Sequence, residues 1–574
     1  MANIKRRKEN KEAAARLKAS GIPPIMAKLY ASRGVRDLED LSTELNDLPD
    51  WQRLKNIEAA AELIGSHIEQ GKHIIILSDY DADGATGCAV GVRGLRELGG
   101  KVDFVIPLRH EHGYGLTPDI VPQILAAHPD LVITVDNGIS SVPGIAKLRE
   151  KGIPVVVTDH HLAPESLPNA NVIVDPNQPG CEYPSKAIAG VGVMYFTLHA
   201  VRAYLTQSGW FASRRMDPPD LLPLLPIVAL GTVADVVPLD RTNRIMVAQG
   251  LDRFHEGDVP PGLASLAAVA KRKLPQMVAQ DFGFYLGPRL NAAGRLADMS
   301  IGVNCLLGED SDQTDALAQQ LEDLNTERKQ VEQATQAEAA RAILEQLGEV
   351  TNGHSISVDG PWNHGVVGIV AGRLKEKHVR PTFVFGQDTD PAKLKGSGRS
   401  IPEYHLRDAL ARIANRYPGI MLGFGGHAMA AGVGILKENV ATFHRALEED
   451  AAEQLADHNF EGIIESDGEL SGAQRSARTA ELLATQVWGQ TFPEPVFDGE
   501  FIVQDAKPMG ADKTHLRLTI TDGAISQQAV WFNALKDGPI DLSGPQRFAY
   551  RLSLNEWKGQ RALQLMIVDR GQLV

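Results

Sequence analysis

The sequence has few cysteines and no long apolar run. Its 574 residues include three cysteines, Cys88, Cys181 and Cys305, which lie far apart in the chain. Cysteines this few and this widely spaced form neither a disulfide framework nor a zinc-binding pattern, and such usage is typical of the reducing cytoplasm. No stretch is apolar for long enough to cross a bilayer as a helix. The sequence therefore argues against a disulfide-stapled or helical membrane protein and predicts a cytoplasmic one with no membrane partner.

The sequence also lacks an excess of positive charge. It has 58 lysines and arginines against 72 aspartates and glutamates, which gives a formal net charge of −14. Taken alone, this balance argues against nucleic acid as a partner, because phosphate backbones attract basic surfaces. An acidic metal site would account for part of the deficit, and local basic stripes could still hold a phosphate backbone. The net charge therefore leaves a nucleic-acid substrate open.

The beginning of the chain is basic but lacks an apolar segment behind it. Residues 1–8 resemble the charged start of an export signal, and the sequence then turns polar and alanine-rich. An export signal needs an apolar core after its charged start, so we expect no export. Residues 1–54 are predicted to form a helical lead-in that ends in a loop near Trp51.

The next part of the chain alternates short apolar runs with helical stretches. Continuous apolar runs are typical of buried parallel strands, and the first of them is expected to lead into a helix over residues 89–98. The segment 55–308 is therefore predicted to be an α/β domain with a mostly parallel sheet and helices on both faces. The runs lie at residues 74–77, 103–106, 131–135, 154–158 and 172–174.

The remaining chain predicts three further parts. Residues 309–350 are rich in Ala, Leu, Gln and Glu, which indicates a long helix that either connects two domains or packs along one. Residues 351–457 read as a smaller α/β domain. Residues 458–574 hold about five short strands separated by turn residues, which favours a small all-β barrel such as an OB-fold.

Three aspartates alternate directly after the first predicted strand. Residues 79–84 read Asp-Tyr-Asp-Ala-Asp-Gly. Carboxylates this close repel one another unless cations lie between them, and hard divalent metals prefer oxygen ligands. The plainer alternative is a helix N-cap with solvated acids, but a cap needs only one aspartate. We therefore expect Asp79, Asp81 and Asp83 to hold metal.

Further candidate ligands follow other predicted strands. Asp136 comes just after residues 131–135, and Asp-His-His at 159–161 comes just after the next strand. Ligands bind outside the carboxyl ends of parallel strands, so these groups should meet at one sheet edge. Asp235 lies in an otherwise apolar stretch, and a buried aspartate is rare unless it is paired or bound to metal.

This collection suits two metals that share a bridging carboxylate. Two such cations can make a nucleophile of water and stabilise both oxygens of a displacement at phosphorus. We found no Ser-His-Asp or Cys-His arrangement in the sequence that offers a better nucleophile. His161 is expected either to contact the phosphate and assist proton transfer or to orient its neighbours. The residues thus predict a metal-dependent phosphodiesterase.

The motifs together resemble those of the DHH phosphoesterase superfamily. The segments 79–84, 136–138, 159–161 and 231–239 resemble its four motifs in order, and 287–295 and 425–432 resemble the RecJ family of bacterial single-strand-specific 5′-to-3′ exonucleases. The resemblance covers nearly the whole chain. It implies a DHH domain with a parallel sheet, a long helix, a smaller α/β DHHA1 domain and an OB-fold barrel.

The resemblance also implies a chemistry and its partners. It implies two Mn2+ or Mg2+ ions, 5′-to-3′ hydrolysis of single-stranded DNA to mononucleotides, and a place in DNA repair and recombination. A single-strand-binding protein and a RecQ-type helicase are the implied partners of a monomer. The implied metal ligands are Asp79, Asp81, Asp83, Asp136, His160 and Asp235, with Asp136 bridging and with Asp136, His160 and His161 at the catalytic centre.

Three glycine-rich segments with cations, 287–295, 395–400 and 423–427, are candidates for holding phosphates, the second with exposed backbone amides. Arginine matches phosphate with a planar fork, and exposed backbone amides bind anions. Each segment could instead be a tight turn with surface charge. A further loop, 109–115, lies near the nucleic acid by family analogy, and its tyrosine could stack on a base or pack internally. The substrate-binding candidates are Arg109, Tyr114, Arg289, Asn291, Arg295, Ser397, Arg399, Gly426 and His427.

The barrel should extend the binding surface along a single strand. Stacking aromatics and cations are what OB-folds use for this purpose, although several of these aromatics must fill the core. The alternatives to an exonuclease are a small-substrate DHH enzyme, which would not need the barrel, and a non-catalytic scaffold, which would not need the acids. The barrel candidates are Arg517, Trp531, Phe532, Trp557, Lys558 and Arg561.

Overall fold

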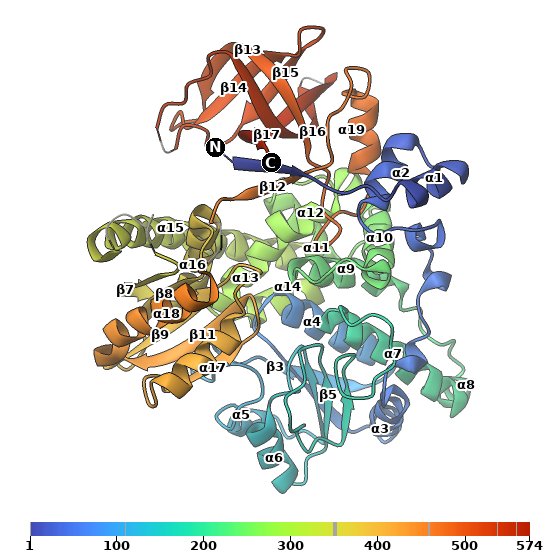
Figure 1. The fold of residues 1–574 in the computed structure, drawn as a ribbon. Helices are drawn as coiled ribbons and strands as arrows, with labels where there is room; N and C mark the ends of the chain where they lie inside the picture. The colour runs from blue at the N-terminus through green and yellow to red at the C-terminus, as the bar shows by residue number, and fades with distance from the viewer. Residues whose placement is uncertain are drawn as a thin grey trace. The chain divides into compact units, whose positions relative to one another are not determined.

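The computed structural model describes residues 2–109, 111–347, 353–456, 458, 460–536, 538–557 and 560–574. Within these residues the chain divides into two compact units. The first spans Asn3–Asp323 and Glu465–Val574, and the second spans Leu324–Ile464. Figure 1 shows the fold, coloured by residue number from the N-terminus to the C-terminus. In the described part of the chain, no helix combines the length and the apolar character of a membrane span.

A five-stranded sheet forms the centre of the first unit. Its order is β3-β2-β4-β5-β6 and every neighbouring pair is parallel. Strands β2, β4, β5 and β6 are short, mainly apolar runs, and β2 and β4 are almost wholly buried, as strands covered on both faces should be. The predicted parallel sheet is confirmed. Its strands are β2 (His73–Ser78), β3 (Lys101–Val105), β4 (Leu131–Val135), β5 (Val155–Thr158) and β6 (Val172–Val174).

Helices cover both faces of this sheet (Figure 1). Helices α5 (Val121–Ala126) and α6 (Val142–Glu150) pack on one face, where Ile124 and Leu148 join the core with Leu77. The other face is covered by α4 (Ala82–Glu97) and α7 (Gly190–Gln207), which also contact each other. Helix α4 begins seven residues before the expected helix.

A second layer of helices follows behind α4. Helix α9 (Leu225–Ala234) packs on α4, and a π-helix (Phe282–Leu286) packs on α9 and leads into α13 (Gly287–Leu296). The long helix α15 (Ser311–Leu347) runs from the first unit into the second. The remaining helices before α15 are α1 (Lys11–Ala19), α2 (Pro24–Ala31), α3 (Ile57–Glu69), α8 (Trp210–Arg214), α10 (Arg241–Glu256), α11 (Pro261–Val269), α12 (Ala279–Asp281) and α14 (Ser300–Leu307).

The second unit has its own mixed sheet in the order β10-β11-β9-β8-β7. Helix α16 (His364–His378) packs with the end of α15 on one face, where Val370 and Ala339 share a core. Helices α17 (Leu406–Arg416) and α18 (Val440–Gln454) cover the other face. The strands are β7 (Ile356–Asn363), β8 (Thr382–Gln387), β9 (Lys393–Arg399), β10 (Gly423–Gly426) and β11 (Ala430–Leu436).

The C-terminal part of the first unit is a closed five-stranded barrel, as predicted. Strands pair in the order β16-β13-β14-β15-β17, and β17 pairs back with β16. Strand β14 alternates buried Leu516, Leu518 and Ile520 with outward residues, which is the period of a strand that lines a core. The strands are β13 (Phe497–Met509), β14 (His515–Thr521), β15 (Ser526–Trp531), β16 (Pro545–Trp557) and β17 (Gln560–Leu573), with α19 (Ala477–Ala484) beside them.

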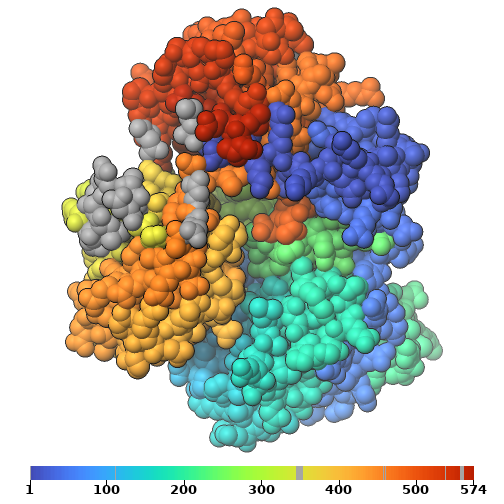
Figure 2. Space-filling model, in the orientation of Figure 1, coloured from blue at the N-terminus to red at the C-terminus, as the bar shows by residue number. Residues whose placement is uncertain are grey.

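The N-terminal segment differs from the predicted helical lead-in. It holds α1 and α2, but it begins with strand β1 (Ala2–Arg6), which lies between β12 (Ile463–Ser466) and β17 in the barrel sheet. The amide of Val574 donates to the carbonyl of Ile4 over 3.1 Å, and Figure 2 shows the blue N-terminal residues against the red barrel. A short polar strand carries no periodic signal, and its pairing partner lies at the other end of the sequence.

Candidate metal centre

The predicted ligands meet at the carboxyl ends of three neighbouring strands. Asp79 follows β2, Asp136 follows β4 and His160 follows β5, and these strands lie side by side. Asp235 reaches the same place from the C-terminal end of α9. The sheet and α9 together therefore gather residues that are more than 150 positions apart in the sequence.

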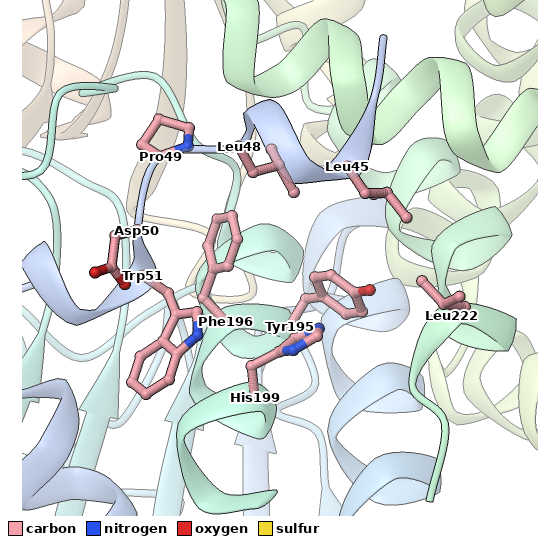
Figure 3. A pocket seen from close by; sticks show the side chains of 9 residues that line it. All are labelled: Leu45, Leu48, Pro49, Asp50, Trp51, Tyr195, Phe196, His199 and Leu222. Atoms are coloured by element: carbon pink, nitrogen blue, oxygen red, sulfur yellow. The ribbon is translucent and has the colours of Figure 1, made fainter. Parts of the chain in front are cut away.

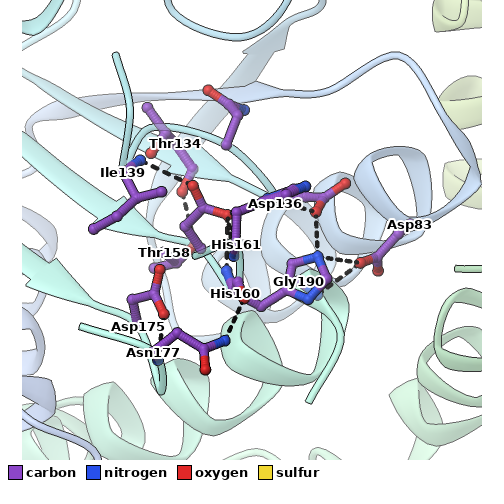
Figure 4. A network of polar contacts seen from close by, with 12 residues as sticks. Asp83, Thr134, Asp136, Ile139, Thr158, His160, His161, Asp175, Asn177 and Gly190 are labelled. Atoms are coloured by element: carbon purple, nitrogen blue, oxygen red, sulfur yellow. Dashed lines mark hydrogen bonds and ion pairs between the residues drawn. The ribbon is translucent and has the colours of Figure 1, made fainter. Parts of the chain in front are cut away.

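The side chains form two groups that join at Asp136 and His160. Asp79, Asp81 and Asp136 offer oxygens that lie within 4.8 Å of one another, and so do the ligand atoms of Asp83, His160 and Asp235. His160 Nε2 lies 3.0 Å from Asp136 Oδ1, 3.6 Å from Asp235 Oδ2 and 3.8 Å from Asp83 Oδ2. Figure 4 shows His160 between Asp83 and Asp136. The geometry provides two adjacent places for a cation.

The loop after β2 is held by a helix cap and by a close backbone contact. The Asp81 carboxylate accepts from the amide of Gly84 and caps α4, and the amide of Ala82 donates to Asn291 Oδ1 over 3.0 Å. A Cβ at Gly84 would lie 2.4 Å from the carbonyl oxygen of Asp79. Gly84 is therefore needed for the close approach of the backbone inside a helix.

The N-terminus of α7 holds the Asp83 carboxylate. The amide of Gly190 donates to Asp83 Oδ2 over 2.6 Å, and the amide of Val191 donates to Oδ1 over 2.9 Å. A helix N-terminus favours a negative charge. Asp83 is buried, so these two amides fix its orientation within the cluster.

Asp136 occupies a backbone conformation that few residues adopt. Its φ is +60°, in the left-handed region, which aspartate tolerates better than most side chains. A Cβ at Gly190 would lie 2.6 Å from Asp136 Cβ. Helix α7 therefore approaches Asp136 so closely that position 190 has no room for a side chain.

His160 is held neutral. Burial, reinforced by the neighbouring His161, lowers the pKa of His160 to about 4. Its carbonyl oxygen accepts from Asn177 Nδ2 over 2.6 Å, which anchors the loop. A neutral imidazole keeps the lone pair that a metal ligand needs.

His161 is a charged partner of Asp159. Burial opposes the charge, but the hydrogen bond with Asp159 and the nearby carboxylates raise the pKa of His161 to about 10. Its Nδ1 lies 2.7 Å from Asp159 Oδ1, which also accepts from the amides of His160 and His161, while Oδ2 accepts from the amide of Ile139. Despite its burial, these contacts lower the pKa of Asp159. Asp159 thus organises the loop and stays outside the ligand groups.

The cluster has the electrostatics of a cation site. Burial and then Asp81 raise the pKa of Asp79 to about 8 and that of Asp83 to about 7, and burial and then Asp83 raise the pKa of Asp136 and Asp235 well above the usual value. Asp79 Oδ1, Asp136 Oδ1 and His160 Nε2 are buried without a hydrogen bond. Unsatisfied buried acceptors of this kind fit divalent cations with oxygen and imidazole ligands.

Two predicted substrate residues lie beside the cluster. The Tyr114 hydroxyl donates to the carbonyl of Asp136 over 3.2 Å and lies 3.2 Å from His161 Nε2, while its ring is 45 % exposed. The Arg109 guanidinium stacks on Tyr80, 4.1 Å from the ring centroid, and donates to the carbonyl of Gly294. Tyr114 therefore touches the centre through its hydroxyl, and its ring makes T-shaped contacts with the rings of Tyr80 and His161.

The segment 287–295 is helical, and two of its residues make internal contacts. Arg289 is buried and pairs with Glu322 over 2.6 Å, while its fork also donates to the carbonyl of Tyr285. Asn291 holds the amide of Ala82. Arg295 lies half-buried at the end of α13. A phosphate contact by Arg289 stays a prediction and would compete with Glu322.

The other two glycine-rich segments belong to the sheet of the second unit. Ser397 and Arg399 lie on β9, where Arg399 donates to Ser397 Oγ. Gly426 (φ +138°) ends β10, and the amide of the exposed His427 donates back to Ala430 in the hairpin. The expectation of exposed amides on residues 395–400 is wrong, and the amide of Ser400 donates to the carbonyl of Met429 over 2.9 Å. Strand β9 is paired on both sides, and the rings of Phe383 and Phe385 fill the space beside its glycines.

The barrel candidates divide into core and surface. Trp531 is buried against Phe548, whereas Phe532 is 49 % exposed. Arg517 and Arg561 are exposed. Lys558 and the side chain of Trp557 lie outside the described residues.

Sequence reasoning missed the groups that support the ligands. Gly190 and Val191 bind Asp83, and Asn177 anchors His160, but none of these residues was a candidate. The alternation of Gly and Val at 190–193, where α7 begins, was the available signal for Gly190. Asn177 follows β6 in a polar loop and carries no signal of its own.

A separate cavity lies away from these ligands. It has a volume of about 230 Å³, and none of the predicted site residues lines it. Figure 3 shows its mainly apolar wall between the N-terminal segment and α7. The lining residues are Leu45, Leu48, Pro49, Asp50, Trp51, Tyr195, Phe196, His199 and Leu222.

Three protein-family models match this chain. The N-terminal domain of the DHH family matches residues 73–232, the DHHA1 domain matches 336–453, and the RecJ OB domain matches 466–569. The three matches follow the order of the parallel sheet, the second unit and the barrel. The first match contains Asp79, Asp136 and His160 and ends three residues before Asp235.

Relatives match over almost the whole length. The single-stranded-DNA-specific exonuclease RecJ of Salmonella typhimurium is 44 % identical over 555 residues, which cover 96 % of each chain. The crystal structure of RecJ from Thermus thermophilus in complex with Mn2+ has a TM-score of 0.82 at 30 % identity and covers all of this chain and 80 % of that one. The corresponding Mg2+ complex has a TM-score of 0.77 at 28 % identity, with 100 % and 79 % covered.

Proposed function

The chain belongs to the RecJ family of single-stranded-DNA-specific exonucleases, and from this premise we propose that it hydrolyses single-stranded DNA from the 5′ end to mononucleotides with two Mn2+ or Mg2+ ions. The observation that carries the proposal is the buried cluster, in which two ligand groups meet at Asp136 and His160. Relatives crystallised with Mn2+ and with Mg2+ support the choice of cation.

The proposed ligands of one cation are Asp79, Asp81 and Asp136, and those of the other are Asp83, His160 and Asp235. Asp136 is proposed to bridge, because its Oδ1 lies 3.0 Å from His160 Nε2 at the junction of the groups. When bound, two such cations supply a nucleophile from water and neutralise charge at phosphorus.

The protein's own residues position the strand and handle the proton. His161 is charged, lies at the edge of the cluster and is held by Asp159. We assign it the role of donating a hydrogen bond to a phosphate oxygen and of giving up a proton as the bond breaks. The hydrogen bond with Asp159 keeps His161 oriented and protonated for this role.

The substrate path is proposed to use both units. Arg109, Tyr114, Arg289, Asn291 and Arg295 would contact the strand from the first unit. Ser397, Arg399, Gly426 and His427 would contact it from the second unit, and the barrel would hold its length. The single-strand preference of the relatives suggests work in DNA repair and recombination in the cytoplasm, as a monomer, with a single-strand-binding protein and a RecQ-type helicase supplying the strand.

Domain boundaries are also a proposal. We place the domains at 55–308, 351–457 and 458–574, with the lead-in at 1–54 and the connecting helix at 309–350. The first and third family matches lie within the corresponding domains, whereas the DHHA1 match starts inside the connecting helix. Limited proteolysis followed by mass spectrometry tests these limits.

The decisive experiment uses a long single-stranded DNA labelled separately at each end, with Mn2+, Mg2+ or a chelator. Mononucleotide release from the 5′ end alone, stopped by chelator and by a duplex 5′ end, is the expected result. Turnover of dinucleotides without cleavage of the long strand would move the protein to the small-substrate DHH enzymes. Binding without any cleavage would make it a scaffold.

A further inference from the structure

An aromatic side chain projects from a distorted helix turn in the first unit. Phe284 is 77 % exposed, while Phe282 and Leu286 of the same π-helix are fully buried. A π-turn inserts an extra residue into a helix, and such turns occur often at functional sites. The turn buries its two ends and leaves the ring of Phe284 in solvent.

The π-helix packs on the end of the helix that carries Asp235. A Cβ at Gly287 would lie 2.9 Å from Ala234 Cβ, and one at Gly283 would lie 3.5 Å from Val233 Cγ1. Asp235 follows directly as the C-cap of α9 and belongs to the metal cluster. Phe284 therefore stands on an element in direct contact with the wall of the metal centre.

A second apolar side chain is held out beside the same ligand. Val236 is 62 % exposed and has a φ of +62°, which is an outlier for a β-branched residue. Strained residues persist where the surrounding structure enforces them, and they cluster at active sites. We call Val236 and Phe284 the apolar lip.

We propose that the apolar lip receives an unpaired base of the strand whose phosphate lies at the metal centre, with Phe284 as the stacking surface. This inference rests on the proposed function. Stacking on an aromatic ring suits every base, because each base has an apolar face. Inside a duplex that face is covered by the neighbouring pairs, so the lip would also favour single strands.

If Phe284 stacks on one base, removing the ring and removing that base should have the same effect on KM, and the two effects should not add. The test measures KM and kcat on single strands in which one nucleotide near the 5′ end is abasic, position by position. Phe284→Ala should raise KM about tenfold on the intact strand, with kcat nearly unchanged. One abasic position should weaken the wild type equally and should add nothing to the loss in Phe284→Ala.

Matched variants separate this pairing from a general loss of fold. Phe284→Trp should restore KM, and Met216→Ala, which shortens a 51 % exposed apolar residue after α8, should behave as wild type. The inference would be overturned if the KM increases from Phe284→Ala and from the abasic nucleotide multiplied at every position. An unchanged KM in Phe284→Ala would also overturn it.

Binding of the same strands in chelator keeps the inference apart from the proposed function. Suppose that the wild type did not cleave, but that Phe284→Ala and one abasic position still weakened binding without adding to each other. The stacking role of Phe284 would then be supported, and the proposed exonuclease activity would be refuted. If cleavage was as proposed but the two losses of affinity were additive in free energy at every position, only the stacking role of Phe284 would be refuted.

Discussion

Single residues at the metal centre have separable roles. Asp83 belongs to a ligand group, and its carboxylate oxygens accept from the amides of Gly190 and Val191. We predict that Asp83→Ala abolishes turnover and leaves most of the affinity for single-stranded DNA, because it removes a metal ligand and spares the binding surface. Nuclease assays and fluorescence anisotropy on the same preparation measure the two properties.

The matched control is Glu62→Ala, which removes an exposed acid from α3. It should keep wild-type turnover. Near-normal cleavage by Asp83→Ala would show that the assignment of the metal ligands is wrong.

Gly190 offers a test of the support behind the ligands. A Cβ at this position would lie 2.6 Å from Asp136 Cβ and 2.9 Å from Asp136 Oδ1. Gly190→Ala should therefore weaken Mn2+ binding by about 10–100-fold, which is the usual cost of disturbing groups that orient ligands. Calorimetric titration with Mn2+ measures the affinity without turnover.

Val191→Ala is the control at the same helix end. It keeps the backbone amide that holds Asp83 and creates space instead of a collision. If both variants bound Mn2+ equally well, α7 would not position the cluster.

The meeting of the candidate ligands at one sheet edge was predictable, and the groups that support them were not. Asp79, Asp136 and His160 each follow a strand, and the geometry of a parallel sheet alone brings such positions together. Gly190 and Arg289 act through partners that are remote in sequence, Asp136 and Glu322. One sequence holds no record of those distances, so the supporting contacts needed the structure.

At the scale of elements, buried strands were the easiest features to predict. Strands β4 and β6 match the apolar runs residue for residue, because strands covered on both faces leave little room for polar residues. Helix α4 was placed seven residues too late. Its first turns contain Asp83, Gly84 and Gly87, which have low helix propensity, and the Asp81 cap and packing against β2 and α7 outweigh it.

One buried carboxylate links the side chains of β1 to those of two barrel strands and of β12. Asp498 on β13 accepts from Arg6 on β1, Arg547 on β16 and Ser466 on β12. We predict that Asp498→Asn lowers the free energy of unfolding of the barrel by about 3 kcal/mol, since it removes one partner of a buried ion pair. Chemical denaturation at neutral pH measures this loss.

The same carboxylate sets a pH dependence. Although burial opposes it, the hydrogen bonds and charges around Asp498 hold its pKa below the usual value. Its contribution is therefore full above the pKa of the unfolded chain, about 4, and is lost as the pH falls through the folded value. The gap between wild type and Asp498→Asn should close below about pH 4. Glu500→Gln, at an exposed position of β13, should show no such gap at any pH.

At the scale of the whole molecule, the barrel should determine how substrate length affects binding. Arg517 and the half-exposed Phe532 lie on its surface. The double variant Arg517→Ala, Phe532→Ala should raise KM for long strands by about tenfold and leave hydrolysis of very short strands unchanged. Steady-state kinetics over a series of strand lengths measures the dependence. Equal losses at every length would refute the barrel's proposed role.

The place of β1 has a consequence for how the protein is made. Strand β1 is the first described strand to leave the ribosome, and β17, its neighbour in the sheet, is the last. The barrel sheet therefore cannot be completed until β17 has been made, and the N-terminal segment must wait while the parallel-sheet domain folds. Joining strands so distant in sequence is intrinsically slow. Nascent chains stalled before β17 should leave Arg6 and its strand open to proteases that the finished protein resists.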